Sequence, residues 1–208
     1  LRKLTKEYTL AISDLIGPHK DIPAPDMFTN EQTMAWIAEA YSQTQGYLEP
    51  AVVTGKPVYL GGSLGRKEAT GTGLFFVLEE AAKYLKINLE GKKVAILGFG
   101  NVGSSIAKLV HQAGCKIIAV TDMFGGVYNE KGIDPIALAQ HVVQTGSVIN
   151  FPDCDPIDNE TLIALPCDIL IPAAVEGQIN KFNASQIKAK IILEGANGPT
   201  TTEADEIL

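Results

Sequence analysis

Six residues, GFGNVG at positions 98 to 103, have the G-x-G-x-x-G spacing that binds the phosphates of a dinucleotide. The run follows a compact apolar stretch typical of a β-strand and precedes a helical pattern, as this motif requires. Gly98 would make the tight turn, Gly100 would let the backbone approach a pyrophosphate, and Gly103 would let the helix pack on the strand. The N–H groups at the start of that helix would then face the phosphates.

A carboxylate that could bind ribose ends the next apolar run, KIIAVTD, at Asp122. Its distance from the first glycine, a little over 20 residues, is typical of this fold. A carboxylate there accepts hydrogen bonds from ribose hydroxyls and repels a 2′-phosphate, which favours NAD, with NADP still possible. Thr121 and the uncharged Met123 leave that preference partly open. The alternative is a strand, turn and helix that bind nothing.

The stretch DIPAPD, residues 21 to 26, places two carboxylates around two prolines. Each proline excludes a helix and biases the residue before it toward extended geometry, so we expect a stiff hook. The residues alone leave two interpretations open. The hook is either a helix stop with ordinary loop acids, or a device that holds a carboxylate still.

Apolar periodicity and capping residues predict the elements that position these groups. Residues 51 to 65 are expected to form short extended pieces, the best linker candidate by composition. Apolar strands separated by helices predict a parallel sheet covered on both faces, a doubly wound, Rossmann-type α/β fold. The expected helices cover residues 3–16, 29–46, 68–85, 104–114, 133–146 and 183–189, and the expected strands cover 92–98, 116–122, 167–174 and 190–196.

Two of the expected helices have an apolar stripe at three- and four-residue steps. In the first helix the stripe consists of Leu4, Tyr8, Ala11, Ile12 and Leu15. In the second it consists of Met34, Ile37, Ala38 and Tyr41, and such a stripe is usually core. Thr29 or Asn30 is the N-cap candidate of the second helix and Gly46 its C-cap candidate, and Asn183 would cap the helix over 183–189.

Composition excludes several function classes. The net charge of −7 comes with scattered lysines and arginines and no basic stripe, so we expect no nucleic-acid binding. No apolar run reaches about 18 residues, so we expect no membrane span. The cysteines and histidines lack ligand spacing, which predicts no metal site, and three reduced thiols fit a cytoplasmic protein. These residues are Cys115, Cys154, Cys167, His19, His111 and His141.

Several segments together resemble the glutamate dehydrogenases of the Glu/Leu/Phe/Val dehydrogenase superfamily. They are DIPAPDM, VVTGKPVYLGGSLGRKEATGTG, GFGNVG, CDILIPAA and EGANGPTTTEADEIL. The resemblance covers essentially the whole chain and implies reversible deamination of L-glutamate to 2-oxoglutarate and ammonia, with hydride transfer to NAD(P). It also implies two domains: a partial α/β substrate and oligomerisation domain over residues 1–62, and a dinucleotide-binding Rossmann domain over residues 63–208.

The resemblance assigns roles to residues of the substrate side. Asp26 matches the catalytic aspartate, which moves protons to and from the substrate nitrogen and the attacking water, while Asp21 would anchor the hook. Arg66 matches a cleft residue that would help to hold the substrate or to close the cleft. A surface ion pair with Glu68 is its alternative role.

The resemblance also assigns cofactor contacts. Thr70, at a helix start, would bind the nicotinamide carboxamide, and Asn197 would lie beside the nicotinamide ribose. Ala173 and Ala174 would flank the adenosine, with simple close packing as the alternative. A turn-forming role is the alternative for Asn197. Within the glycine motif the cofactor-binding residues would be Gly98, Phe99, Gly100, Asn101, Val102 and Gly103.

One departure from the family is large. The catalytic lysine of these enzymes lies in a GGxKGG segment, and this sequence has no such segment. It also lacks the family's pocket lysines and a serine that contact the substrate. The chain begins without Met, and both ends look like cuts, so we expect a central fragment of a longer, hexameric enzyme. Such a fragment would bind dinucleotide without oxidising glutamate. The alternatives are a leucine, phenylalanine or valine dehydrogenase, or a non-catalytic nucleotide-binding module.

Overall fold

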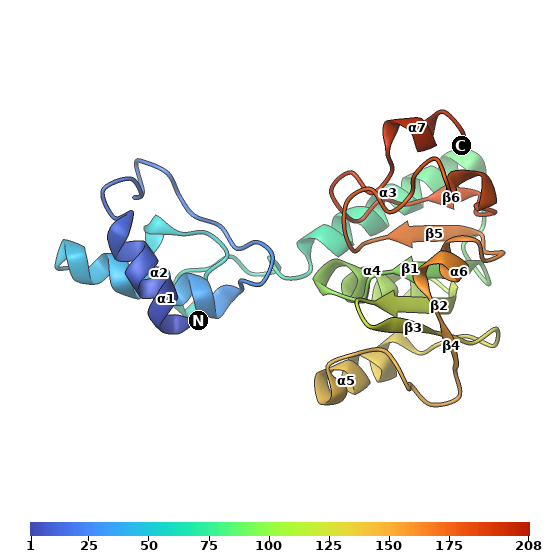
Figure 1. Cartoon of the computed structure of the whole chain (residues 1–208), viewed down its shortest axis with the longest axis horizontal. Coiled ribbons are helices and arrows are strands. Elements are labelled where there is room, and N and C mark those ends of the chain that lie inside the picture. Colours follow the sequence, from blue (N-terminus) through green and yellow to red (C-terminus); the bar gives the residue numbers. More distant parts are fainter. The chain divides into compact units, whose positions relative to one another are not determined.

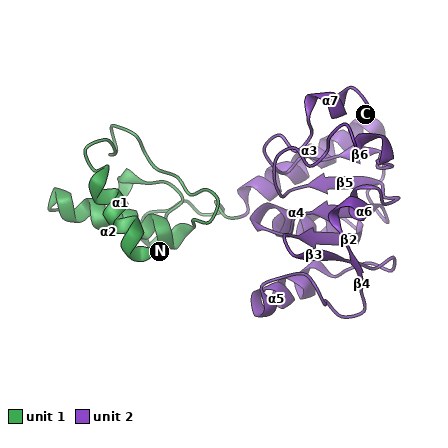
Figure 2. Ribbon diagram, in the orientation of Figure 1, with its two compact units in different colours: residues 1–67 green, residues 68–208 purple.

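The computed structural model describes all 208 residues and divides into two compact units, Leu1–Lys67 and Glu68–Leu208 (Figure 2). The domain boundary expected from the sequence, between residues 62 and 63, lies a few residues before the division between the units. None of the helices combines the length and the apolar character that crossing a bilayer requires.

Unit 1 is built from helical segments (Figure 1). They are α1 (Arg2–Ala11), α2 (Glu31–Gln45) and the 3-10 helices η1 (Pro50–Val52) and η2 (Val58–Leu60). Helix α2 begins at Asn30, whose side chain accepts hydrogen bonds from the N–H groups of Gln32 and Thr33, and it ends at Gly46 in the left-handed conformation. Its predicted apolar stripe is confirmed as core, because Met34, Ile37, Ala38 and Tyr41 are all buried.

Helix α1 is shorter than the predicted 3–16 and ends at Ala11. A turn follows, in which the N–H groups of Leu15 and Ile16 both donate to the carbonyl of Ile12. The predicted apolar stripe is also largely wrong, because Leu4, Tyr8 and Leu15 are 69%, 58% and 66% exposed. Of its members, Ile12 does pack against the core of unit 1.

The buried side of α1 carries threonines instead, Thr5 and Thr9. Their hydroxyls donate to the carbonyls of Leu1 and Thr5, one turn earlier, at 3.2 and 2.7 Å. Burial of these polar side chains therefore leaves no hydroxyl proton unpaired.

The extended pieces predicted over residues 51–65 are replaced by the two 3-10 turns. Pro50 occupies the first position of η1, and the Glu49 carboxylate caps it by accepting from Ala51 N. Gly61, in the left-handed conformation, ends η2. Proline and a capping acid therefore favour a helical turn over an extended chain here.

Unit 2 contains one sheet of six strands in the order β4-β3-β2-β1-β5-β6. The strands are β1 (Lys93–Leu97), β2 (Lys116–Asp122), β3 (Gly125–Tyr128), β4 (Asp155–Ile157), β5 (Ile169–Pro172) and β6 (Ile191–Ile192). Strands β2, β1, β5 and β6 are parallel, as predicted, whereas β3 and β4 are antiparallel and were not predicted. Their brevity hides any alternation of apolar and polar residues, so the sequence gives no strand signal for them.

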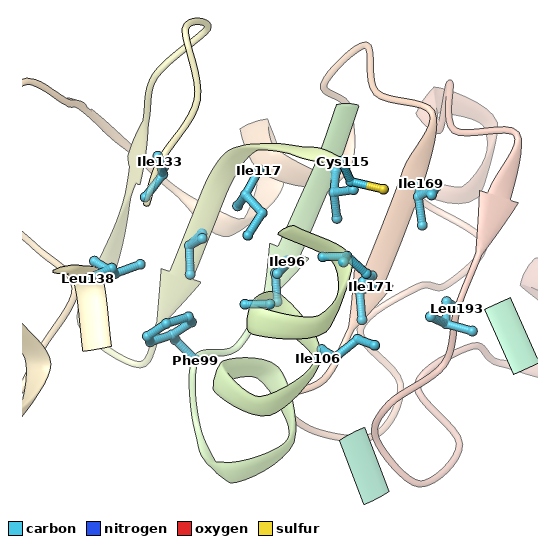
Figure 3. Close-up of a cluster of buried hydrophobic side chains, with 14 of the residues drawn as sticks. Ile96, Phe99, Ile106, Cys115, Ile117, Ile133, Leu138, Ile169, Ile171 and Leu193 are labelled. Carbon is cyan, nitrogen blue, oxygen red and sulfur yellow. The ribbon is translucent and has the colours of Figure 1, made fainter. Parts of the chain in front are cut away.

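Helices cover both faces of this sheet, which confirms the doubly wound arrangement (Figure 1). Side chains of α3 (Ala69–Leu85), α4 (Asn101–Gln112) and α5 (Pro135–Thr145) pack on one face. Side chains of α6 (Asn159–Ile163), η3 (Ala184–Gln186) and α7 (Thr202–Asp205) pack on the other. Figure 3 shows the first of these cores, where Ile96 and Ile106 meet between β1 and α4.

Three predicted elements of unit 2 differ from the structure by more than two residues at one end. Helix α4 begins at Asn101, because Gly100 serves as its N-cap, and β6 keeps only two residues of the predicted 190–196. The helix predicted over 183–189 is the three-residue η3. Its expected cap, Asn183, instead accepts from the N–H of Asn180 through its side chain.

Two glycines in the first turns of α3 have opposite surroundings, which gives a matched test of the α3–α4 contact. A Cβ on Gly71 would lie 2.5 Å from Ser105 Oγ and 3.0 Å from Ile106 N, whereas one on Gly73 would meet nothing within 4 Å. Gly71→Ala should therefore lower the free energy of unfolding by about 1–3 kcal/mol through overpacking. Gly73→Ala should raise it by roughly 0.5–1 kcal/mol through helix propensity. Urea unfolding measures both, and equal effects would contradict the close contact.

The cysteines provide a pH-dependent test of burial. Burial raises the pKa of the Cys115 and Cys167 thiols to about 11 and also raises the pKa of Cys154. At pH 8 roughly one molecule in a thousand would carry a thiolate at either of the first two. An alkylating reagent should therefore modify the half-buried Cys154 first, and the other two only on unfolding.

The same shifts predict that the free energy of unfolding falls as pH rises from about 9 to 11, since unfolding then releases protons.

Peptide mass mapping after timed alkylation checks the order in which the three cysteines react. Rapid modification of native Cys115 or Cys167 at pH 8 would contradict this burial.

Candidate functional site

The carboxyl ends of the four parallel strands bring the predicted cofactor residues of unit 2, apart from Thr70 in α3, to one edge of the sheet. Backbone hydrogen bonds continue the strand register into the following loops, so the loops lie side by side. These bonds run from Gly98 N to Thr121 O (3.0 Å), from Ala173 N to Leu97 O (2.8 Å) and from Gly195 N to Pro172 O (2.9 Å). Strand β1 has β2 on one side and β5 on the other, so its end is the switch point where open α/β sheets bind ligands.

The three glycines of the motif have the different surroundings that the sequence predicts. Gly98 has φ +100°, and a Cβ there would lie 2.6 Å from Ala174 Cβ. A Cβ on Gly103 would lie 1.9 Å from the carbonyl oxygen of Gly98, so the helix packs directly on the turn. A Cβ on Gly100 would meet nothing within 4 Å. Gly98 and Gly103 are therefore required by packing, whereas Gly100 borders open space, which fits the approach of a pyrophosphate.

The other residues of the motif differ in exposure. The Phe99 side chain is 7% exposed and belongs to the sheet core (Figure 3), so only its backbone can face a ligand. Asn101 is exposed and Val102 is half-buried in the first turn of α4. The first N–H groups of a helix have no intrahelical acceptor, and here they follow the open position at Gly100.

The Asp122 carboxylate ends β2, as predicted, but it is already hydrogen-bonded within the protein. Three groups donate to it: Phe124 N to Oδ1 (2.8 Å), Ser147 Oγ to Oδ2 (2.7 Å) and Val148 N to Oδ2 (2.7 Å). The two lone pairs of Oδ2 are thus occupied, and Oδ1 keeps one for a ribose hydroxyl. Sequence reasoning missed Ser147, because a serine in a Thr-Gly-Ser turn gives no signal that it reaches a strand 25 residues earlier.

The remaining predicted cofactor residues are small or exposed. Ala174 contacts Gly98, and Ala173 lies beside Gly195, so both alanines do pack closely, as their alternative interpretation expects. Thr70 is the second residue of α3 and is exposed. Asn197 follows β6 and is exposed. No hydrogen bond within the protein occupies the Thr70 or the Asn197 side chain, so both can bind a ligand.

The proline hook in unit 1 is held by contacts on both sides. Gly17 N donates to the Asp21 carbonyl, and Thr54 N donates to the Pro23 carbonyl, both at 3.0 Å. A Cβ on Gly55 would lie 2.5 Å from the Pro25 ring, so the ring packs against that glycine. The residues between Asp21 and Asp26 form neither helix nor strand.

The acids at the two ends of the hook are exposed. The Asp26 carboxylate accepts one hydrogen bond, at 2.7 Å, from the N–H of the next residue, Met27. Asp21 anchors the hook through its backbone carbonyl, while its carboxylate makes no hydrogen bond or ion pair. Arg66 is exposed and forms no ion pair with Glu68 or any other acid, so its alternative role as an ion-pair partner is not realised.

Two family models match the chain. The model for Glutamate/Leucine/Phenylalanine/Valine dehydrogenase matches residues 61–208, including the glycine motif. The model for the Glu/Leu/Phe/Val dehydrogenase dimerisation domain matches residues 1–43, including the hook. The chain belongs to the Glu/Leu/Phe/Val dehydrogenase family.

Individual family members are similar over the whole chain. The chain is 46% identical over 208 residues to the cryptic catabolic NAD-specific glutamate dehydrogenase GudB of Bacillus subtilis, covering 100% of the chain and 48% of the relative. It is 36% identical to a hetero-hexameric glutamate dehydrogenase of Thermus thermophilus, with a TM-score of 0.91 over 99% of the chain and 48% of that structure. It is 35% identical to glutamate dehydrogenase of Peptoniphilus asaccharolyticus, with a TM-score of 0.73 over 100% of the chain and 49% of that structure. The chain therefore spans about half the length of these family members.

The geometry of the motif predicts different consequences for two of its glycines. Gly100→Ala should leave the urea midpoint nearly unchanged, because φ is −76° and the Cβ meets open space. It should weaken NADH binding roughly tenfold, about 1.4 kcal/mol, because the methyl group blocks the closest approach of the phosphates. Gly103→Ala, the matched change, should destabilise unit 2 through its contact with the Gly98 carbonyl.

Fluorescence titration with NADH and urea unfolding of both variants check this contrast. Loss of stability in Gly100→Ala, or full stability in Gly103→Ala, would contradict the assignment of these glycines.

Proposed function

We propose that the full-length protein is an NAD(P)-dependent amino-acid dehydrogenase that interconverts L-glutamate with 2-oxoglutarate and ammonia. The observation that carries this proposal is the open position at Gly100 after β1, with the Asp122 carboxylate at the end of the neighbouring strand β2, at the switch point of a sheet in a chain of this family. The names of the similar proteins, all glutamate dehydrogenases, favour glutamate as the substrate.

The residues of unit 2 would bind and orient the cofactor. The turn after β1 and the first N–H groups of α4 would hold the pyrophosphate, and Asp122 would accept a ribose hydroxyl through the free lone pair of Oδ1. Thr70 and Asn197 would contact the nicotinamide half, and Ala173 and Ala174 would let the adenosine lie against the backbone. A bound nicotinamide would accept hydride from the substrate carbon. NAD is favoured because of Asp122 and because GudB is NAD-specific.

The residues of unit 1 would act on the substrate. Asp26 would carry the proton to and from the substrate nitrogen and the attacking water, since its carboxylate is exposed and is held only by a neighbouring N–H. The hook limits its motion, because backbone bonds and the Pro25–Gly55 contact fix the chain on either side. Arg66, which has no acidic partner within the chain, would help to hold the substrate carboxylate.

Assembly and compartment belong to the same proposal. The hetero-hexameric relative supports a hexamer for the full-length protein, and the match of residues 1–43 to a dimerisation domain supports contacts through unit 1. The three free cysteines support a reducing compartment, the cytoplasm.

The proton-transfer role of Asp26 is tested with a matched pair of variants in the hook. Asp26→Asn in the full-length protein should lower the rate of glutamate-dependent NADH formation about 10²–10⁴-fold, the usual contribution of a general acid–base group. It should leave NADH binding unchanged. Asp21→Asn removes an equally exposed carboxylate from the same hook and should retain activity. Equal losses in both variants would contradict a specific role for Asp26.

The 208-residue chain by itself should bind NADH but form none from glutamate, because no GGxKGG lysine segment lies in it. Glutamate-dependent NADH formation by this chain would contradict the assigned division of labour. If the full-length protein instead oxidises leucine or phenylalanine in preference, the substrate assignment is wrong while the family role stands.

A further inference from the structure

The loop after α5 reaches the end of β2 and holds Asp122 there. Ser147, only 6% exposed, donates from Oγ to Asp122 Oδ2 at 2.7 Å, and Val148 N donates to the same oxygen at 2.7 Å. The hydroxyl oxygen of Ser147 in turn accepts from Ile149 N at 3.2 Å. Its position is therefore fixed from the acceptor side, and its single proton is committed to the carboxylate.

The loop that carries Ser147 is itself held from α5. Thr145 Oγ1 lies 2.9 Å from the carbonyl oxygens of both His141 and Ser147, which share its single proton, and it accepts from Ser147 N at 3.4 Å. The Ile149 carbonyl lies 3.0 Å from His141 Nε2. Ser147 therefore donates to Asp122 from a segment whose backbone is fixed on both sides of it.

These contacts limit how the Asp122 side chain can turn. Rotation about its side-chain bonds would break both bonds to Oδ2 and the bond from Phe124 N to Oδ1. A carboxylate that cannot turn keeps its free Oδ1 lone pair in one direction, and it cannot move its negative charge away from a 2′-phosphate. Since like charges held close together repel strongly, a fixed carboxylate discriminates better than a mobile one.

We propose that Ser147 is a positioning residue for cofactor choice, which acts through Asp122 to favour NAD over NADP. This inference rests on the proposed dinucleotide-binding function, and it adds a residue in a loop distant in sequence from the glycine motif. Ser147 touches the carboxylate and not the cofactor. Its effect therefore appears in the ratio of the two affinities more than in overall stability.

The test compares the dissociation constants of NADH and NADPH for the wild-type protein and for Ser147→Ala, measured by fluorescence titration. Loss of one hydrogen bond to a charged group should weaken NADH binding about three- to tenfold. NADPH binding should stay equal or improve, because Asp122 can then turn away from the 2′-phosphate. The preference for NADH should accordingly fall roughly tenfold.

Control variants separate positioning from general loop stability. Thr145→Val removes a hydroxyl that holds the same loop but leaves both donors to Asp122 Oδ2 in place, so it should lower the affinity ratio by less than Ser147→Ala does. Ser147→Thr keeps the donor and should retain the wild-type ratio. In an Asp122→Asn background, Ser147→Ala should no longer change the ratio, because the two residues act through one contact. If Ser147→Ala does not fold, Ser147→Cys, a similar shape with a weak donor, must lower the ratio in the same direction.

The outcomes test the dinucleotide-binding function and the role of Ser147 separately. A wild-type protein that binds neither nucleotide refutes the dinucleotide-binding function, and the role of Ser147 falls with it. A wild-type protein that prefers NADH, with an unchanged ratio in Ser147→Ala, refutes the role of Ser147 alone. Equal shifts of the ratio in Ser147→Ala and Thr145→Val also refute it, because they would show a merely structural effect.

Discussion

The architecture of unit 2 depends on one close contact, the start of α4 against the turn that leaves β1. A Cβ at Gly103 would lie 1.9 Å from the Gly98 carbonyl oxygen, so no side chain fits between helix and turn. On the other side of the turn, Gly98 lies against Ala174 at the end of β5 with a similar lack of space. These contacts bring the ends of β1 and β5 together, and Gly100 is left facing outward from the most crowded part of the sheet edge.

Because space at this sheet edge is so limited, the groups that can face a ligand there are backbone groups and short side chains. Phe99 contributes its ring to the core on one face of the sheet (Figure 3). The small side chains of Ala173 and Ala174, after β5, pack against Gly195 and Gly98. The Asp122 side chain provides a long-range tether at this edge, because the loop after α5 holds it with two hydrogen bonds. Backbone packing thus sets the shape of the site, and a side-chain network sets its charge.

The sequence predicts the elements with strong periodicity and clear caps. Strand β2 has the predicted bounds, and α2 begins and ends at predicted capping residues. Short elements are predicted poorly. Strands β3 and β4 have too few residues to show a period, and the helix expected at 183–189 is a single 3-10 turn. The stripe on α1 fails for another reason. Hydroxyls bonded to the preceding turn can be buried at little cost, so apolar spacing does not decide which face turns inward.

Motif residues were predictable as a set, but their partners were not. The positions of Gly98, Gly100 and Gly103 follow from spacing, and their different roles agree with the space around each. Ser147 could not be found from spacing, because a hydrogen bond between segments 25 residues apart depends on where α5 ends. Asp21 also differs from expectation, because it anchors the hook through its backbone carbonyl and not through its carboxylate.

The two acids given functional roles differ in how they are bonded, and this difference suits their roles. Asp122 accepts three hydrogen bonds and has one free lone pair, so it is suited to accept a hydrogen bond from a fixed direction. Asp26 accepts one hydrogen bond from a neighbouring N–H, and its other lone pairs are open to solvent or substrate. A proton carrier needs those open positions, but it also needs a fixed backbone. The prolines of the hook supply that backbone without occupying the carboxylate.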